Sequence, residues 1–407
     1  MSTLYIILVV AAILIVGIAL VIMTRPRGRR DVKSLYTEGL DHLLRGNLKQ
    51  AYQCFKGVID RDTEHTSAYL KLGQVMRRGG ASESALKLHE SLLVRSELTV
   101  YERVELLKNL ALDHGELRQY DQAVERVLAI LKLEKRNAWA LRHLVKFYRG
   151  LGNWEAAGKY LAQWQKATDK EDTRLLALCR FRQGYDQRHE ESPETIRGHY
   201  QQALKIDGNF APAQYFLAES YVEEADSYRR ELSTLNTSDE ADDPLKQQNL
   251  EEKVAKLYSQ AVAHWSAFLD ISPSDTSMVL PKVEDALFYL QRFDDMEPFL
   301  KQILGKDPDN LDVVAGLANF YVRKGDLDRA EVLLSTIPEA ATSNPLIQAI
   351  QLKLSYRQDD QRNLKPELDH LVDSIRLQAQ AQASYREAPT SLMSWLDPSS
   401  DPLEKLE

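Results

Sequence analysis

The chain has few of the residues that crosslink a protein or break its regular structure. Its 407 residues include 2 cysteines, 18 glycines and 14 prolines. Cysteines as far apart as Cys54 and Cys179 exclude a disulfide scaffold and a multi-cysteine metal module. Low glycine and proline argue against a β-sandwich, which needs many turns. The simplest inference is a protein of a reducing compartment.

An excess of positive charge is also lacking. The formal net charge is −8 at pH 7, although residues 25–33 are locally basic. The net charge of the remaining residues is therefore more negative than −8. Because contacts with phosphate need a basic face, the sequence predicts no binding of nucleic acid.

Signatures of catalysis are absent from the sequence. It contains no H-E-x-x-H, no glycine-rich phosphate loop and no nucleophile elbow. Paired carboxylates such as Glu223-Glu224 fall on polar helix faces, where solvation accounts for them. We therefore expect a protein that is not an enzyme and that uses no cofactor and no metal.

The longest apolar run is Leu4 to Met23, twenty residues without a charge. A helix of this length spans the hydrocarbon core of a bilayer, which is about 30 Å thick. A cleaved signal peptide would need basic residues before the run and a small-residue cleavage site after it, and the sequence has neither. Residues 1–24 are thus predicted to be an uncleaved transmembrane anchor.

A basic juxtamembrane stretch, residues 25–34, follows the anchor. The positive-inside rule places it and all later residues, 25–407, in the cytoplasm, with the N-terminus outside. This predicts a single-pass protein of the bacterial inner membrane. The cations either set topology alone or also attract anionic lipid. They are Arg25, Arg27, Arg29, Arg30 and Lys33.

Small or apolar residues recur at helical spacing with a period of about 34. This period is typical of the tetratricopeptide repeat, in which two antiparallel helices form each unit. Glycines at 46, 80, 152 and 325 fall where the two helices of a unit must turn. The sequence predicts an all-α tetratricopeptide-repeat solenoid of about eight repeats over residues 35–338. The residues in phase are Ala51, Ala85, Ala123, Ala157, Ile196, Ala261, Met296 and Ala330.

Three segments depart from the repeat. An extended helical hairpin is predicted at 227–252, and its acidic tip is either a charged linker or a site where a partner docks. Capping helices are predicted at 339–383 and a flexible tail at 384–407. An apolar cluster in the tail would dock either on the solenoid or on a partner. Its members are Leu392, Met393, Trp395 and Leu396.

The first helices of such repeats line an extended concave surface that suits binding of protein segments. The positions next to the packing residues carry several arginines and a lysine, so this predicted groove is locally basic. Those side chains are either solvated helix formers or ligands of an acidic partner. The clamp for chaperone carboxyl termini is not predicted, because its positions in repeat three read Lys108 and Leu112. The groove candidates are Gln74, Arg77, Arg78, Arg142, Lys146, Arg149, Phe181, Tyr185 and Arg188.

The order of these features is similar to that of a known family. The opening Tyr36–Leu44 and the second repeat, with Arg77-Arg78-Gly79 followed by His89, resemble the lipopolysaccharide assembly protein B family over residues 1–380. Members of that family are non-enzymatic adaptors of the inner membrane. The resemblance implies a link between a membrane AAA protease and the deacetylase that commits precursors to lipid A.

One departure separates the chain from that family. Its members end in a rubredoxin-like ribbon with two Cys-x-x-Cys pairs, whereas residues 384–407 contain no cysteine. The chain would then be a divergent member or a paralogue with another partner. The second hypothesis is therefore a scaffold for another envelope assembly, such as a secretion or division complex. Neither hypothesis specifies an oligomeric state.

Overall fold

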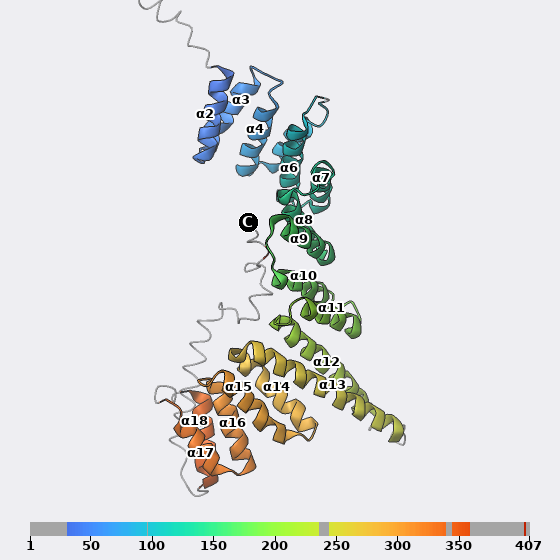
Figure 1. The fold of residues 1–407 in the computed structure, drawn as a ribbon, viewed down its shortest axis with the longest axis vertical. Coiled ribbons are helices and arrows are strands. Elements are labelled where there is room, and N and C mark those ends of the chain that lie inside the picture. Colours follow the sequence, from blue (N-terminus) through green and yellow to red (C-terminus); the bar gives the residue numbers. More distant parts are fainter. Residues whose placement is uncertain (1–30, 96, 236–243, 339–343, 359–402, 404–407) are drawn as a thin grey trace, which may run out of the picture. The chain divides into compact units, whose positions relative to one another are not determined.

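The computed structural model describes residues 31–95, 97–235, 244–338, 344–358 and 403 (Figure 1). Every regular element within these ranges is a helix, which confirms the predicted all-α class. The helices form two compact units, Met1–Leu151 and Gly152–Glu407.

The first unit is a succession of helical hairpins. Helices that follow one another in the chain pack together, and α4 also packs against α6. The helices are α2 (Val32–Leu44), α3 (Leu48–Ile59), α4 (Thr66–Arg78), α5 (Ser82–Glu90), α6 (Val100–Glu116), α7 (Tyr120–Leu133) and α8 (Ala138–Gly150).

The second unit continues in the same way with α9 (Trp154–Thr168), α10 (Thr173–Asp186), α11 (Pro193–Ile206), α12 (Ala211–Leu235) and α13 (Pro244–Ile271). It ends with α14 (Thr276–Tyr289), α15 (Met296–Lys306), α16 (Leu311–Lys324), α17 (Leu327–Ser335) and α18 (Pro345–Gln358). Short 3₁₀ turns at Pro273–Asp275 and Phe293–Asp295 precede α14 and α15.

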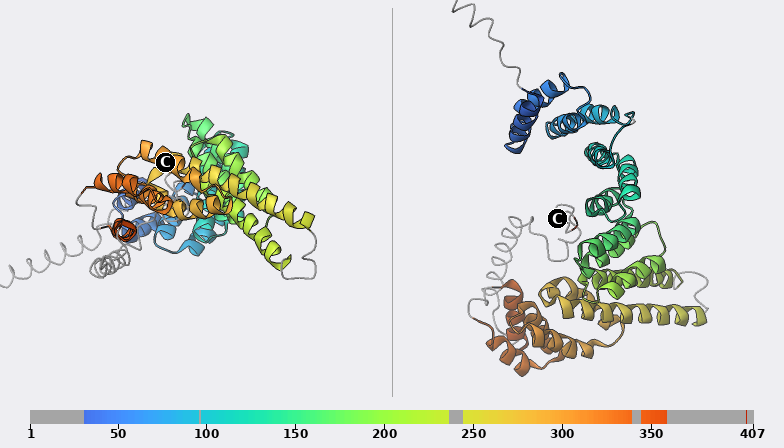
Figure 2. Two further views of the ribbon diagram at one scale, coloured as in Figure 1. Left: turned by 90° about the horizontal axis from the view of Figure 1, so that it is seen from below. Right: turned by 45° about the horizontal axis from the view of Figure 1, so that its top comes forward.

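Helices α12 and α13 are longer than their neighbours, with 25 and 28 residues. They lie side by side and extend beyond the other helices of their unit (Figure 2). The predicted hairpin segment, 227–252, covers the end of α12 and the start of α13. The acidic residues of its tip, 239–243, lie outside the described residues.

The residues in phase occupy the helix contacts that the repeat requires. The alanines at 51, 85, 123, 157, 261 and 330 are fully buried, and Ile196 and Met296 are nearly so. A side chain that stops at Cβ lets two helix backbones approach closely, which explains why alanine recurs at these contacts.

The turns within hairpins depend on left-handed residues. Gly46, Gly80, Gly152 and Gly325 have φ of 76°, 84°, 70° and 81°, so their predicted role at the turns is confirmed. Glycine adopts this conformation without the steric penalty that a Cβ introduces. The turn between α6 and α7 instead uses Arg118, with φ of 56°.

Helix starts carry their own local signals. Thr99 and Glu102 form a reciprocal capping box at α6, because each side chain accepts a hydrogen bond from the other residue's backbone N–H. At α8 the Asn137 side chain accepts from the backbone N–H of Ala140 at 2.9 Å. These caps satisfy N–H groups that have no acceptor inside the helix.

In the part of the chain that the structure describes, no helix has both the length and the apolar character needed to cross a bilayer. The predicted anchor at 4–23 and the four arginines after it lie outside that part, whereas Lys33 is exposed on α2. Helix α18 packs on α16 and α17, where the first capping helix is predicted. The rest of the predicted cap and the apolar tail cluster, Leu392 to Leu396, also lie outside the described residues.

Candidate functional site

Arg77, one of the predicted groove residues, is committed to an internal ion pair. It reaches from α4 to α6, where its Nη1 donates to Asp113 Oδ1 at 2.6 Å and to the carbonyl oxygen of Asn109 at 3.3 Å. The Arg77 side chain is 10% exposed and that of Asp113 is 0% exposed. The prediction that Arg77 lies on an open groove is therefore wrong, because the next repeat supplies a buried carboxylate to hold it.

His89 completes this arrangement from α5. Its Nδ1 hydrogen-bonds the second carboxylate oxygen of Asp113, and its Nε2 lies 3.3 Å from the carbonyl oxygen of Leu70. The ring fits because residue 73 is glycine, where a Cβ would lie 2.3 Å from His89 Nε2. Arg77, His89 and Asp113 thus form a buried triad that joins the second and third repeats.

Three other predicted groove residues are partly exposed on the first helices of unit 1. Gln74 accepts a hydrogen bond from Lys71 Nζ at 3.2 Å, and Arg78 Nη1 donates to the carbonyl oxygen of Leu43 at 3.4 Å. Arg149 lies at the end of α8.

A basic cluster surrounds His143 on α8. It consists of Lys108, Arg142 and Lys146, the three cations whose charge acts on the imidazole. Burial and then these cations lower the pKa of His143 to about 4, against the opposing effect of its hydrogen bond to the carbonyl oxygen of Trp139. The indole of Trp139 stacks on the imidazole with 3.7 Å between ring centroids. Lys108 also forms an ion pair with Glu105, at 2.8 Å.

Phe181 lies in the core of unit 2. It is fully buried, and its ring centroid is 5.3 Å from that of Tyr200, 5.6 Å from Phe210 and 5.4 Å from Phe216. The prediction that Phe181 lines a groove is wrong, because an aromatic side chain at this first-helix position packs against α11 and α12 instead.

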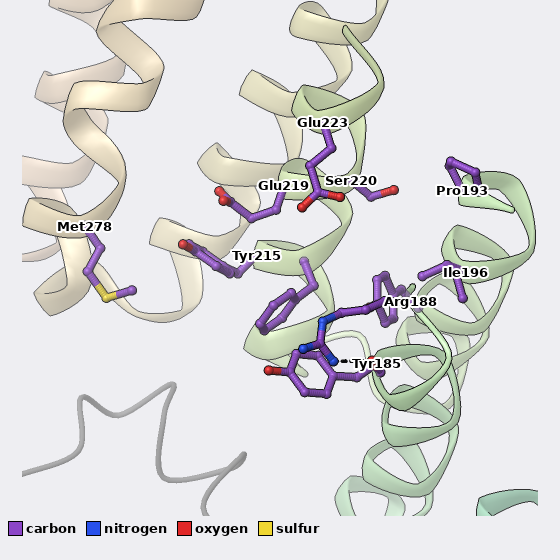
Figure 3. Close-up of a pocket in the computed structure, with 11 residues that line it drawn as sticks. Tyr185, Arg188, Pro193, Ile196, Tyr215, Glu219, Ser220, Glu223 and Met278 are labelled. Carbon is purple, nitrogen blue, oxygen red and sulfur yellow. Dashed lines mark hydrogen bonds between the residues drawn. The ribbon is translucent and has the colours of Figure 1, made fainter. Parts of the chain in front are cut away.

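The aromatic pocket is a cavity of about 280 Å³ in unit 2 (Figure 3). Four rings line it: Tyr185 from α10, Tyr200 from α11, and Tyr215 and Phe216 from α12. Packing with Phe181 and with one another holds these rings in place, since Tyr185 and Phe216 meet edge to face at 5.0 Å. The pocket is therefore supported by the core directly behind it.

Charged side chains also line the pocket beside these rings. Arg188 is exposed, lies with its guanidinium carbon 3.9 Å from the centroid of Tyr185, and donates from Nη1 to the carbonyl oxygen of Tyr185 at 2.6 Å. Glu219 and Glu223 line the pocket from α12, and Figure 3 shows both side chains on that helix. The pocket thus has one guanidinium and two carboxylates beside an aromatic surface.

Lys282 of α14 fixes part of this wall. Its Nζ donates to both oxygens of Glu219, at 2.6 and 2.7 Å, and to Tyr215 Oη at 2.9 Å. Burial lowers the pKa of Lys282, but the contacts with Glu219 and Tyr215 outweigh it and leave the pKa raised. Burial also raises the pKa of Tyr200. Lys282 is therefore charged and Tyr200 neutral near pH 7. The Glu223 side chain is exposed.

Tyr185 and Arg188 are the predicted groove residues that meet at this pocket. The sequence analysis missed Tyr215, Glu219 and Glu223, which follow one another at intervals of four and so share one face of α12. That interval is a signal in the sequence, but the long α12–α13 hairpin interrupts the repeat and hides its phase there.

The arrangement is that of a binding site. Aromatic rings can bury an apolar side chain, and a few fixed charges can orient what is attached to it. The residues that line the pocket include neither histidine nor cysteine. Ser220, the serine among them, is buried, and its hydroxyl oxygen accepts a hydrogen bond from Arg197 Nη1 at 3.4 Å.

Comparison with known proteins identifies the repeats. Residues 287–354 and 108–172 match family models that describe the tetratricopeptide repeat. The chain is 25% identical over 122 residues to lipopolysaccharide assembly protein B of Escherichia coli strain K12, which covers 30% of this chain and 31% of that protein. The chain therefore matches about a third of the length of this relative.

Two solved structures are similar at lower identity. A tetratricopeptide repeat protein from Parabacteroides merdae is 14% identical, with 81% of this chain and 99% of that chain covered and a TM-score of 0.34. MamA is 15% identical, with 44% and 92% covered and a TM-score of 0.34. The family models establish that the chain contains tetratricopeptide repeats, a fold that serves as a scaffold for protein–protein interaction.

Proposed function

We propose that the protein is a non-enzymatic adaptor that binds segments of other proteins on the first helices of its repeats. The observation that carries this proposal is the aromatic pocket. Its rings are held by the core, so little conformational entropy is lost when a ligand packs on them. Arg188 and Glu223 are exposed beside the rings and give the bound segment a direction.

The aromatic pocket and the basic cluster define the chemistry of the partner segment. An apolar or aromatic side chain enters the pocket, a neighbouring carboxylate meets Arg188, and a neighbouring cation meets Glu223. The basic cluster in unit 1 takes an acidic stretch, because Lys108, Arg142 and Lys146 lie on adjacent first helices and together outweigh Glu105, which pairs with Lys108 at 2.8 Å. Contacts of both kinds weaken as salt is raised.

The finer proposal concerns place and pathway. The protein is anchored in the bacterial inner membrane by residues 1–24, with residues 25–407 in the cytoplasm. There it links a membrane AAA protease to the deacetylase of lipid A synthesis and so regulates lipopolysaccharide production. Two facts support this: the apolar run followed by five basic residues, and the 25% identity to lipopolysaccharide assembly protein B over 122 residues.

Crosslinking in native membranes, followed by identification of the bound proteins, tests the proposal. We expect wild-type protein to recover the protease and the deacetylase, and Arg188→Glu to lose at least one of them. Arg136→Glu is the matched control, since Arg136 is exposed in the α7–α8 loop. Recovery of secretion or division proteins instead would favour the scaffold for another envelope assembly. If wild type, Arg188→Glu and Arg136→Glu recover the same partners in equal amounts, the aromatic pocket does not bind them.

The membrane arrangement has its own tests. A reporter fused after Glu407 should be active only as a cytoplasmic fusion, and periplasmic activity would contradict the orientation. Replacing residues 4–23 with an unrelated membrane helix should keep the protein in the membrane and weaken recovery of the protease. Unchanged recovery would assign all binding to the repeats.

A further inference from the structure

Glu38 and His42 of α2 lie close to Cys54 of α3, where these two helices pack together. One ligand atom from each, a carboxylate oxygen, a ring nitrogen and the sulfur, lies within 4.8 Å of the other two. Glu38 and His42 are one helical turn apart on α2, so both side chains leave the same face, and Cys54 approaches them from α3. None of these residues belongs to the aromatic pocket, the basic cluster or the buried triad.

We infer that these three side chains form a metal site for a divalent cation of the zinc type. Zinc accepts sulfur, imidazole nitrogen and carboxylate oxygen, at about 2.0–2.3 Å. Tetrahedral coordination at those lengths places ligand atoms about 3.5 Å apart. Side chains already within 4.8 Å of one another therefore reach coordination by small rotations. The mixed ligand set favours zinc over magnesium or calcium, which take oxygen ligands.

The state of His42 supports the site independently. Its Nδ1 is buried without a hydrogen-bond partner, and its Nε2 is 3.9 Å from the nearest carboxylate oxygen of Glu38, too far for a hydrogen bond. A buried polar atom left unsatisfied destabilises a fold. Coordination would use one lone pair of this imidazole and orient the ring, leaving the other nitrogen for a carboxylate or water.

Burial and charge also fit an ion. Cys54 is buried at the floor, whereas Glu38 and His42 are partly exposed and leave a path from solvent. When the sulfur–metal bond forms, the thiol loses its proton to water. A thiolate and a carboxylate then balance the two positive charges of the metal. The three protein ligands leave a fourth position for water or for a donor from a partner.

The site would stabilise the repeat in which it lies. Helices α2 and α3 form the first described repeat, and repeats in a solenoid depend on contacts with their neighbours for stability. An ion that joins the two helices adds a connection within the repeat itself. The sequence analysis predicted no metal because it sought ligands close in sequence, whereas His42 and Cys54 lie on different helices.

Cobalt titration of the full-length protein under reducing conditions tests this inference, with Cys179→Ser as the matched control. Cys179 is also a buried thiol, and within the described residues it belongs to no such cluster. We expect wild type and Cys179→Ser to bind one Co²⁺ with a thiolate-to-cobalt charge-transfer band. Cys54→Ser should lose the band, and His42→Gln should bind at least about tenfold more weakly.

A thermal measurement keeps the test decisive if Cys54→Ser folds poorly. Zinc should raise the melting temperature of wild type and of Cys179→Ser, and should not raise that of His42→Gln, whose altered side chain is partly exposed. Absence of a thiolate band in folded wild type would overturn the inference. An equal zinc response in wild type and His42→Gln would overturn it as well.

Discussion

Arg77 and Arg188 are both predicted groove residues, and they end in opposite situations. Arg77 in unit 1 is almost buried and held by Asp113, which in turn hydrogen-bonds His89. Arg188 in unit 2 is exposed and stacks on Tyr185 beside the aromatic pocket. An arginine on a first helix is therefore held inside the fold where the next repeat offers a buried carboxylate, and it stays exposed where it stacks on an aromatic ring instead.

The largest expected effect comes from removing the carboxylate of the triad. Asp113→Ala leaves the Arg77 guanidinium without its ion-pair partner and His89 without its acceptor, so the free energy of unfolding should fall by about 3–5 kcal/mol. Glu116→Ala, an exposed carboxylate on the same helix, should change it by no more than about 0.5 kcal/mol. Urea titration measures both. A loss below about 1 kcal/mol for Asp113→Ala would mean that the triad does not hold the repeats together.

His143 should make the stability of unit 1 depend on pH in the mildly acidic range. Its pKa is about 4 in the fold and about 6.5 when unfolded, so the unfolded chain binds the extra proton first as pH falls. The contribution of His143 to the free energy of unfolding is complete above pH 6.5 and falls by about 3 kcal/mol between there and pH 4. Subtracting the pH profile of His143→Gln isolates this contribution. Parallel profiles for the two proteins would contradict it.

Gly73 should be less tolerant of alanine than a glycine with space around it. In Gly73→Ala the new Cβ would lie 2.3 Å from His89 Nε2, and the forced shift should destabilise by about 1–3 kcal/mol. In Gly198→Ala the new Cβ would meet no neighbouring side chain or helix within 4 Å. The higher helix propensity of alanine should therefore stabilise the protein by about 0.5–1 kcal/mol. Thermal melts followed by circular dichroism compare them. Similar melting temperatures would show that His89 does not depend on Gly73.

Local patterns made the fold predictable. Alanine at helix contacts and glycine at left-handed turns recur with the repeat, and both follow from sterics within one hairpin. The pairing of Arg77 was not predictable in the same way, because Asp113 lies 36 residues away, in the next repeat. An acidic residue about one period after a basic one is the signal that would have found it.

The candidate site was predictable only in part. Tyr185 and Arg188 follow from the register of repeat five, but Phe181 in that repeat turned out to be core. Glu219 and Glu223 lie on α12, whose extension removes the period that would have marked them. The sequence therefore indicated the helix that forms one wall of the pocket and missed the helix that forms the other.

Separate charge reversal of the two arginines tests the account most directly. Arg77→Glu should lower the free energy of unfolding by at least about 3 kcal/mol, since it sets a negative charge against buried Asp113. Arg188→Glu should lower it by no more than about 1 kcal/mol, the value of an exposed cation–π contact, and should reduce partner recovery about tenfold. Unchanged recovery with Arg188→Glu, or a fully stable Arg77→Glu, would contradict the division of roles between the two arginines.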